Sequence, residues 1–350
     1  MEKYRSSTDA ATGIHPFLPP SAAVSRGSTP FAACVLGALV LAPVWLPVVL
    51  VWLVLDGLHM CGLRDAVAGR ALLSMLGGAN LLDPTMSDMQ TYKPAGRRRR
   101  TDETTPTQTS DHEWIKIRNA HGALVVVNTP TPLAVLLLSL KISPTFVVPA
   151  QSGCGMAVPA SHVVEISTRQ AVLLASAARF GDWRRILLSI SCGKSSASSA
   201  AATSGQTTEL SALLKQKKQA RGGPVVIFAE GMPTNGRGVA RFAFSLDASN
   251  ELRGKSDSSF SMFACGFLYE LAPQAVPRVE VSRTRYFVRL LGSASFLRPL
   301  RICMSVQVVP EPGRLEHARA ALAQCVRLPL LNVGTEERER FESQWAEANK

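Results

Sequence analysis

The sequence predicts an α/β protein with an amino-terminal membrane-embedded helix or hairpin. Residues 31–55, FAACVLGALVLAPVWLPVVLVWLVL, contain no charged side chain. After residue 113, short apolar runs typical of strands alternate with longer segments typical of helices, which favours a sheet flanked by helices. With 350 residues, 46% of them hydrophobic, the chain is long enough to bury a sizeable core.

The charge and the cysteines limit the kinds of ligand. A formal net charge of +12 favours a partner that carries phosphate, such as a nucleic acid, an anionic membrane or a phosphorylated small molecule. No aromatic residues interleave the run Arg97–Arg100, so we expect a solvated loop near lipid head groups and no nucleic-acid partner. The seven cysteines show no C-x-x-C spacing. We therefore expect neither a metal site nor a dense disulfide framework.

The uncharged run at 31–55 predicts membrane attachment, because a spanning helix needs about 20 such residues. The mostly polar segment 1–30 precedes it, and the run is too long for a cleaved signal peptide. Pro43 and Pro47 each remove a helix hydrogen bond, so a kinked, re-entrant segment and a spanning helix both remain open. The alternative is a helix buried in a protein core. A weaker apolar stretch at 71–82 could form a second, interfacial helix, which would complete an anchoring region at 31–82.

Residues 83–113 are rich in Thr, Asp, Pro and Ser and predict a disordered linker that faces the cytosol. A domain at 114–332 and a charged helix at 333–350 follow. The expected elements are strands at 114–119, 123–128, 144–150 and 225–229, helices at 132–140, at 167–182 with a Ser or Thr cap and at 207–220 with Gly222 as its end, and a loop at 193–206.

Glu230 stands at the carboxyl end of the apolar strand predicted at 225–229. Ligands of open α/β sheets usually bind at the carboxyl ends of strands, which makes this carboxylate a candidate site residue. The alternative is structural: such a carboxylate can cap the next helix or pair with an arginine that the fold buries.

The stretch FAEGMPTNG at 228–236 resembles the third sequence block of the glycerolipid acyltransferases, in the form E-G-T-x-T-N. Glu230, Gly231, Thr234 and Asn235 match this block, whereas Met232 and Pro233 depart from it. MEKY at the start of the chain and TGIHPFLP at 12–19 resemble the opening of the fungal lysophosphatidate acyltransferases that use oleoyl-CoA. The resemblance implies transfer of an acyl group from acyl-CoA to lysophosphatidate, without a further cofactor. It also implies a place on the endoplasmic reticulum or on lipid droplets, with the catalytic domain in the cytosol.

The first block of that family is N-H-x-x-x-x-D, and the stretch NTPTPLA at 128–134 resembles it. The histidine and the aspartate, which form the catalytic pair of the family, are both replaced in this stretch. Asn128 matches, but Thr129 stands at the position of the histidine base and Ala134 at that of the aspartate that orients it. Threonine is far too weak a base for this step, and a positioned base contributes typically ~10²–10⁴-fold. His121 and His162 are the candidates for a replacement base.

The sequence offers three arginines as candidates for binding the phosphate of the acceptor. Arg237 is the arginine nearest to the third block and could form a bidentate pair with phosphate. Arg184 and Arg185 lie in the interval where the family carries the arginine of its second block. Two functions remain open from the sequence: an acyltransferase that turns over, and a degenerate acyltransferase fold that binds lipid or a protein partner without turnover.

Overall fold

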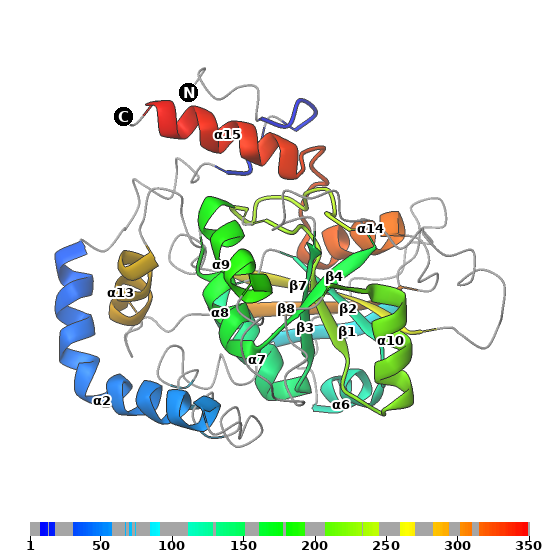
Figure 1. Cartoon of the computed structure of the whole chain (residues 1–350), viewed down its shortest axis with the longest axis horizontal. Helices are drawn as coiled ribbons and strands as arrows, with labels where there is room; N and C mark the ends of the chain where they lie inside the picture. The colour runs from blue at the N-terminus through cyan, green and yellow to red at the C-terminus, as the bar shows by residue number, and fades with distance from the viewer. Residues whose placement is uncertain are drawn as a thin grey trace.

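A central sheet with helices on both faces forms the body of the protein in the computed structural model of the chain (Figure 1). This is the α/β architecture that the alternating pattern predicts. The residues that the structure describes are 8–12, 14–17, 31–57, 67, 70–71, 74, 85–91, 111–128, 131–150, 161–177, 180–192, 207–232, 234–244, 260–269, 283–293, 302–309 and 315–348.

The sheet contains eight strands among the described residues, in the order β1-β8-β7-β2-β6-β3-β4-β5. Its four central strands, β7, β2, β6 and β3, are parallel, whereas β8 and β4 run antiparallel to them. The strands are β1 (Thr85–Thr91), β2 (Leu124–Val127), β3 (Thr145–Pro149), β4 (His162–Ile166), β5 (Thr207–Glu209), β6 (Val225–Phe228), β7 (Met262–Tyr269) and β8 (Ile302–Val309).

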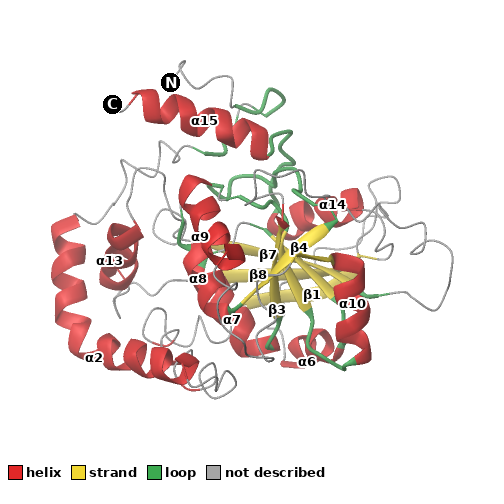
Figure 2. Cartoon of the chain, viewed as in Figure 1, coloured by secondary structure: helices red, strands yellow, loops and turns green. Residues whose placement is uncertain are grey.

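The helices cover both faces of this sheet (Figure 2). Buried side chains of α6, α7, α8 and α9 belong to the apolar cluster on one face, and those of α10 and α14 to the cluster on the other. The described helices are α2 (Phe31–Gly57), α6 (Asp111–Asn119), α7 (Pro132–Ile142), α8 (Thr168–Ala175), α9 (Phe180–Cys192), α10 (Leu210–Gln219), α13 (Arg283–Ser293), α14 (Leu315–Val326) and α15 (Thr335–Ala348).

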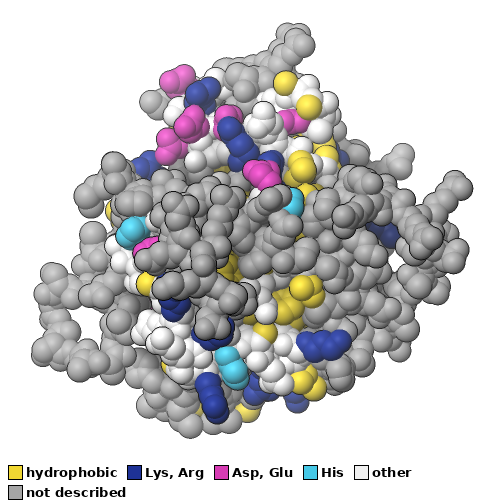
Figure 3. Space-filling view, turned by 90° about the vertical axis from the view of Figure 1, so that its right-hand side faces the viewer, with side chains coloured by type: hydrophobic (Ala, Val, Ile, Leu, Met, Phe, Trp, Pro, Cys, Tyr) yellow, Lys and Arg dark blue, Asp and Glu magenta, His cyan; other side chains and the backbone are white. Residues whose placement is uncertain are grey.

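Charged side chains are unevenly placed on the side of the molecule where α10 lies (Figure 3). Most of the acidic side chains on this face gather in its upper part, at the level of α15. Lysine and arginine side chains lie mainly in its lower half, at the level of α10. Helix α10 has lysines and no acidic residue, whereas α15 combines acidic residues with arginines.

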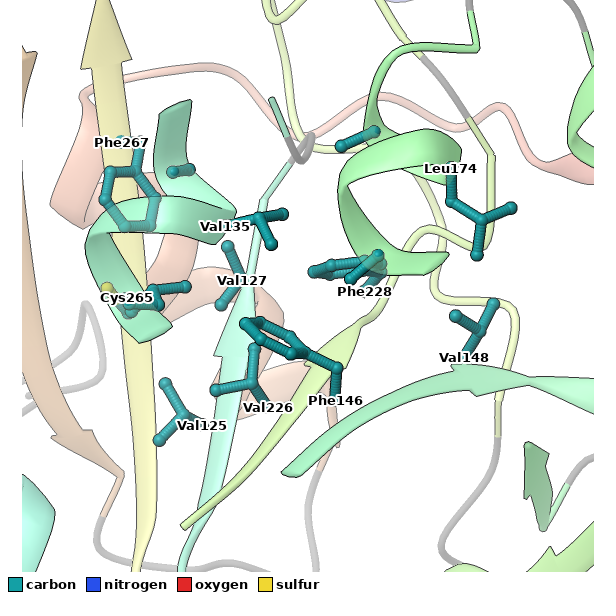
Figure 4. Close-up of a cluster of buried hydrophobic side chains, with 14 of the residues drawn as sticks. Val125, Val127, Val135, Phe146, Val148, Leu174, Val226, Phe228, Cys265 and Phe267 are labelled. Carbon is teal, nitrogen blue, oxygen red and sulfur yellow. The ribbon is translucent and has the colours of Figure 1, made fainter. Parts of the chain in front are cut away.

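Burial on both faces explains why the central strands read as continuous apolar runs rather than as alternating ones. Every residue of β2 and of β6 is buried. On the face that α7 and α8 cover, side chains from four neighbouring strands and both helices interdigitate (Figure 4). The labelled residues are Val125, Val127, Val135, Phe146, Val148, Leu174, Val226, Phe228, Cys265 and Phe267.

Several predicted elements are confirmed. Strands lie at 124–127, 145–149 and 225–228, and helices at 132–142 and 335–348. Ser167 caps α8 through a complete capping box with Gln170, as its place before the apolar run predicts. The amphipathic segment at 207–220 is helical from Leu210 onward, while its first three residues form the short strand β5.

The strand predicted at 114–119 is wrong, because these residues belong to helix α6. Trp114 and Ile117 are buried three residues apart, whereas Ile115 is half exposed, which is the period of a helix face. The helix predicted at 167–182 ends at Ala175, and α9 begins at Phe180.

The structure also differs from the predicted linker and from the predicted end of α10. Residues 85–91 of the linker form the edge strand β1, which pairs with β8 and so obtains its backbone hydrogen bonds without an apolar sequence pattern. The left-handed residue that ends α10 is Arg221, at φ 49°, and not Gly222. Gly222 instead donates its N–H to the Lys217 oxygen, at 2.8 Å, in the turn after the helix.

Strands β7 and β8 and helices α13 and α14 lie where the sequence predicted no element. The loop predicted at 193–206 and most of the helix predicted at 71–82 lie outside the described residues. Within the polar segment 1–30, Asp9 and Phe17 are buried against the rest of the protein. The amino terminus therefore contributes to the fold.

Helix α2 contains the whole apolar run and continues through Pro43 and Pro47. Figure 1 shows it as two arms with a bend between them. Its leucine and valine side chains are largely exposed, with Leu36 at 64% and Val40 at 68%. Among the described residues, α2 is the helix long and apolar enough to cross a membrane, by length and composition. Its exposure argues against the alternative of a buried core helix.

Candidate functional site

The two stretches that resemble the first and third acyltransferase blocks meet at the carboxyl edge of the sheet. Strands β2 and β6 are adjacent and parallel, and Val127 pairs with Phe228 at their ends. Asn128 follows β2 directly, and Glu230 lies two residues beyond β6. Because neighbouring strands lie about 4.8 Å apart, the fold brings together two segments that are distant in the sequence.

Asn128 is buried, and its side-chain amide is paired with the backbone of β7. Its Nδ2 donates to the Phe267 oxygen at 3.1 Å, and its Oδ1 accepts from the Phe267 N–H at 2.9 Å. The amide thus takes the place of a backbone peptide group and extends the β2–β7 pairing beyond Val127. This geometry fixes the turn after β2. Both the NH2 group and the oxygen of the Asn128 amide take part in it.

The aspartate position of the first block belongs to the core. Thr131 caps α7 by accepting the Ala134 N–H at 3.3 Å, and Pro132 opens the helix. This cap places Ala134 in the first turn, where it is 1% exposed within the apolar cluster of α7. Thr129, at the histidine position, lies outside the described residues.

Glu230 is buried, 2% exposed, and both of its carboxylate oxygens accept hydrogen bonds. Oε2 accepts from the Thr234 hydroxyl at 3.0 Å, and Oε1 accepts from the Ala240 N–H at 3.3 Å. Two separate turns of the loop that follows β6 are therefore tied to one carboxylate. Gly231, which donates its N–H to the Phe228 oxygen at 3.0 Å, has φ of +61°, a conformation that glycine adopts without strain.

Arg319 contributes to the site and was not among the residues predicted from the sequence. Its guanidinium, on α14, donates from Nε to the Ala240 oxygen at 3.0 Å and from Nη2 to the Val239 oxygen at 3.3 Å. Burial lowers the pKa of Arg319, while the carboxylates of Glu316 and Glu230 oppose that change. Glu230 and Arg319 thus hold the N–H and the carbonyl oxygen of the same residue, Ala240, and the carboxylate lies near enough for its charge to act on the partly buried guanidinium. An arginine between the apolar positions of LEHARAALAQC was the sequence signal.

Asn235 connects this loop to the amino terminus. Its Nδ2 donates to the His15 oxygen at 2.8 Å, and its backbone N–H donates to the Pro16 oxygen at 2.7 Å. Its Oδ1 accepts the Arg237 N–H at 3.1 Å, which closes a local turn. The Arg237 side chain is exposed on the surface of this turn. The two segments that carry the family resemblance, TGIHPFLP and EGMPTN, are therefore in direct contact.

Helix α15 holds the amino-terminal segment from its other side. The guanidinium of Arg338, which is fully buried, lies 4.8 Å from the centre of the Phe17 ring, and the His15 and Phe341 rings pack edge to face. Burial lowers the pKa of Arg338 to about 10, and Glu342 opposes that change through an ion pair at 3.0 Å. These contacts seat residues 14–17 between α15 and the third block.

Neither candidate replacement base lies beside Asn128 and Glu230. His121 is at the amino end of β2, the opposite edge of the sheet, with its Nδ1 3.1 Å from the Gly222 oxygen. His162 begins β4, which is antiparallel, so it does lie at the carboxyl edge. It is nonetheless three strand positions from β2, or about 14 Å, too far for a hydrogen bond.

The other predicted arginines face α15 or solvent. Arg184 forms an ion pair with Glu339 at 3.2 Å, and Arg185 is exposed on α9. A pocket of about 250 Å³ lies between residues 241–244 and 334–337, beyond the loop that Glu230 holds. None of the predicted site residues lines it.

The described part of the chain contains no group of three or more His, Cys, Asp or Glu side chains placed to hold a metal ion. At the carboxyl edge the structure provides a loop that is hydrogen-bonded to the buried Glu230 carboxylate and to the partly buried Arg319 guanidinium. Such an arrangement can position a ligand. Comparison of the chain with models of protein families, with curated proteins and with solved structures finds no match.

Proposed function

We propose that the chain is a membrane-bound acyltransferase that moves a fatty acyl group from acyl-CoA to lysophosphatidate and produces phosphatidate. One observation carries the proposal: Asn128 and Glu230, from two sequence blocks that resemble the same family, lie at the carboxyl ends of adjacent parallel strands. The exposed apolar helix α2 gives the same chain a means of reaching lipid substrates. The proposal includes a place on the endoplasmic reticulum or lipid droplets, with the sheet domain in the cytosol where acyl-CoA occurs.

In this reaction the oxygen of the acceptor hydroxyl forms an ester bond with the acyl carbon, and the bond from that carbon to the CoA sulfur breaks. The hydroxyl proton leaves and the CoA thiolate is protonated. Asn128 and Glu230 would act by fixing the loops that bind the substrates, because their own polar atoms already hold backbone and hydroxyl groups. Holding two substrates in reactive positions can contribute as much as a base does.

The second candidate is a degenerate acyltransferase fold that binds lipid at a membrane without turnover. A specific observation favours it: Ala134, at the position of the orienting aspartate, is packed in the core. In either case the side chains of Asn128 and Glu230 accept hydrogen bonds from backbone N–H groups. Both candidates share the fold and the membrane attachment, and they differ only in whether phosphatidate forms.

The experiment uses the full chain in detergent with labelled oleoyl-CoA and lysophosphatidate, and it measures labelled phosphatidate by chromatography. Turnover requires a rate above the blank without protein, together with a loss of that rate in Gly231→Val, which strains the loop after β6. Arg340→Gln on the exposed side of α15 is the control and should retain the rate. A rate equal to the blank, with labelled lysophosphatidate still bound to the protein, would establish the second candidate instead.

A further inference from the structure

Helix α2 packs on the protein along one narrow stripe. Cys34, Ala38 and Trp52 are buried, whereas the leucine and valine side chains on the remaining faces are exposed. The spacing of these residues places them on one face of the helix. A helix surface this apolar and this long needs a covering, and the absence of charged residues from positions 31–55 suits hydrocarbon rather than a polar protein surface.

Helix α13 lies beside the first arm of α2, the darker blue part in Figure 1. Its sequence, RTRYFVRLLGS, has three arginines and no acidic residue. Tyr286 and Leu290 are buried, while Arg285 is exposed and Arg289 is half buried. Arg289 lies near enough to Cys34 for its charge to act on the thiol. A basic helix thus borders the apolar one.

We propose that α13 binds the anionic head groups of phospholipids through Arg285 and Arg289, and that it thereby holds the first arm of α2 within one leaflet, parallel to the membrane surface. The ligand of α13 in this proposal is the surface of an anionic bilayer. It rests on the exposed apolar area of α2 and on the charge of the neighbouring helix. It depends on membrane attachment but not on acyl transfer.

The arginines decide between a spanning and an in-plane arrangement. If α2 crossed the bilayer, α13 would accompany its first arm into the hydrocarbon, where each arginine is expensive. At the interface the same side chains reach phosphate groups and form charge-assisted hydrogen bonds. Helix α2 contains Pro43 and Pro47 and is bent, so its second arm can leave the direction of the first without crossing the bilayer, and both ends can stay on the same side. The in-plane arrangement places the arginines at the head groups and the apolar surface of α2 in hydrocarbon.

Vesicle flotation of the full chain tests the head-group contact. Vesicles of phosphatidylcholine alone are compared with vesicles that also contain phosphatidylglycerol, at low and high sodium chloride concentrations. A basic side chain near an anionic surface contributes about fivefold to binding, so Arg285→Gln with Arg289→Gln should weaken binding to the anionic vesicles roughly 25-fold. Binding to neutral vesicles should stay unchanged, and salt should reduce the difference between wild type and variant.

The matched control removes the same charge from the opposite side of the molecule. Lys215→Gln with Lys218→Gln changes two exposed residues of α10, which lies far from α13 in Figure 1, and should leave binding unchanged. Arg285→Lys with Arg289→Lys keeps the charge and should retain most of the binding. If both double Gln variants lose equal affinity, the effect is one of net charge and the proposal is wrong. If the Lys variant binds as weakly as the Gln variant of α13, damage to the helix explains the loss, and the proposal is wrong in that case too.

A cysteine-modification experiment tests the in-plane arrangement. Cysteines introduced as Phe31→Cys and Gly57→Cys mark the two ends of α2, and full-chain protein bound to sealed vesicles is treated with a membrane-impermeant maleimide. Peptide mapping then reports the modification at each end separately from that of the native cysteines. Equal modification of both ends supports the proposal. Protection of one end, with release on addition of detergent, shows a spanning helix and overturns it.

Discussion

The side-chain amide of Asn235 donates a 2.8 Å hydrogen bond to the backbone oxygen of His15, which lies 220 residues earlier in the chain. The bond joins an amino-terminal motif to the loop after β6. Asn235 accordingly has a structural partner in addition to any ligand, and its substitution has a consequence for stability that does not depend on catalysis.

Asn235→Ala should lower the free energy of unfolding by about 1–2 kcal/mol, because the His15 oxygen and the Arg237 N–H each lose a hydrogen-bond partner. Hydrogen exchange should increase in residues 14–17. The control is Asn332→Ala, whose exposed side chain is removed while its backbone N–H still reaches Asp9. Equal effects of the two substitutions in urea unfolding would show that the Asn235 side chain does not hold the amino terminus.

Glu230→Gln should destabilise the protein by about 2 kcal/mol. The substitution keeps the shape but replaces a charged acceptor of two hydrogen bonds and removes the carboxylate whose charge acts on the partly buried Arg319. Glu336→Gln, at a carboxylate whose side chain is 80% exposed, should leave stability nearly unchanged. A double-mutant cycle with Arg319→Lys measures the coupling, and additive effects would show that Glu230 and Arg319 act independently.

Ala134→Asp should cost at least about 3 kcal/mol, because it places a carboxylate in the apolar cluster of α7. Ala134→Ser, which adds only a hydroxyl, should cost about 1 kcal/mol. Introducing the histidine–aspartate pair of the acyltransferases, as Thr129→His with Ala134→Asp, should therefore destabilise the protein rather than raise turnover. A double variant as stable as the wild type, measured by thermal unfolding, would show that the first turn of α7 can accommodate a charge.

The stability of the protein should fall between pH 9 and 12 in part through Cys325. Burial raises the pKa of this thiol from 9.0 to about 12 in the folded protein. Above pH 9 the unfolded chain releases the proton while the folded chain keeps it, so ionisation favours the unfolded state. Cys325→Ala should lose about 1 kcal/mol less stability than the wild type between pH 8 and pH 10. Parallel pH profiles of the two proteins in urea unfolding would contradict the prediction.

Val40→Glu should reduce binding to phosphatidylcholine vesicles about tenfold or more, because it places a carboxylate on the exposed apolar surface of α2. The substitution should leave the unfolding of the sheet domain unchanged. Ile115→Glu, at an exposed apolar residue of α6, is the matched control and should not alter vesicle binding. If the two substitutions have the same effect on flotation, α2 is not the attachment surface.

Much of the fold could be predicted because local signals and tertiary context agree. The runs LVVV and VVIF are buried on both faces, and Ser167 begins α8 with a capping box. The prediction failed where tertiary contacts decide. The run WIKIRN has a period that fits a strand as well as a helix, and packing of Trp114 and Ile117 selects the helix. Strand β1 forms because β8 offers an open edge, which a polar sequence does not reveal.

The candidate site, too, could be predicted only in part from the sequence. Glu230 could be singled out from its place after an apolar strand, and Asn128 from its resemblance to the first block. Their proximity depends on the strand order, which places β2 beside β6. The role of Arg319 depends on α14 crossing the other face of the sheet, and nothing in its local sequence fixes that contact.

The sequence by itself determined the apolar helix α2, the buried central strands and the carboxylate at the end of β6, because hydrophobic periodicity and strand termini are local properties of the chain. Only the tertiary structure decided that Ala134 is packed in the core, that Asn235 holds His15 and that α13 borders α2. These relationships join residues far apart in the chain. They are fixed by which surfaces must be covered and which polar atoms must be paired once the sheet has formed.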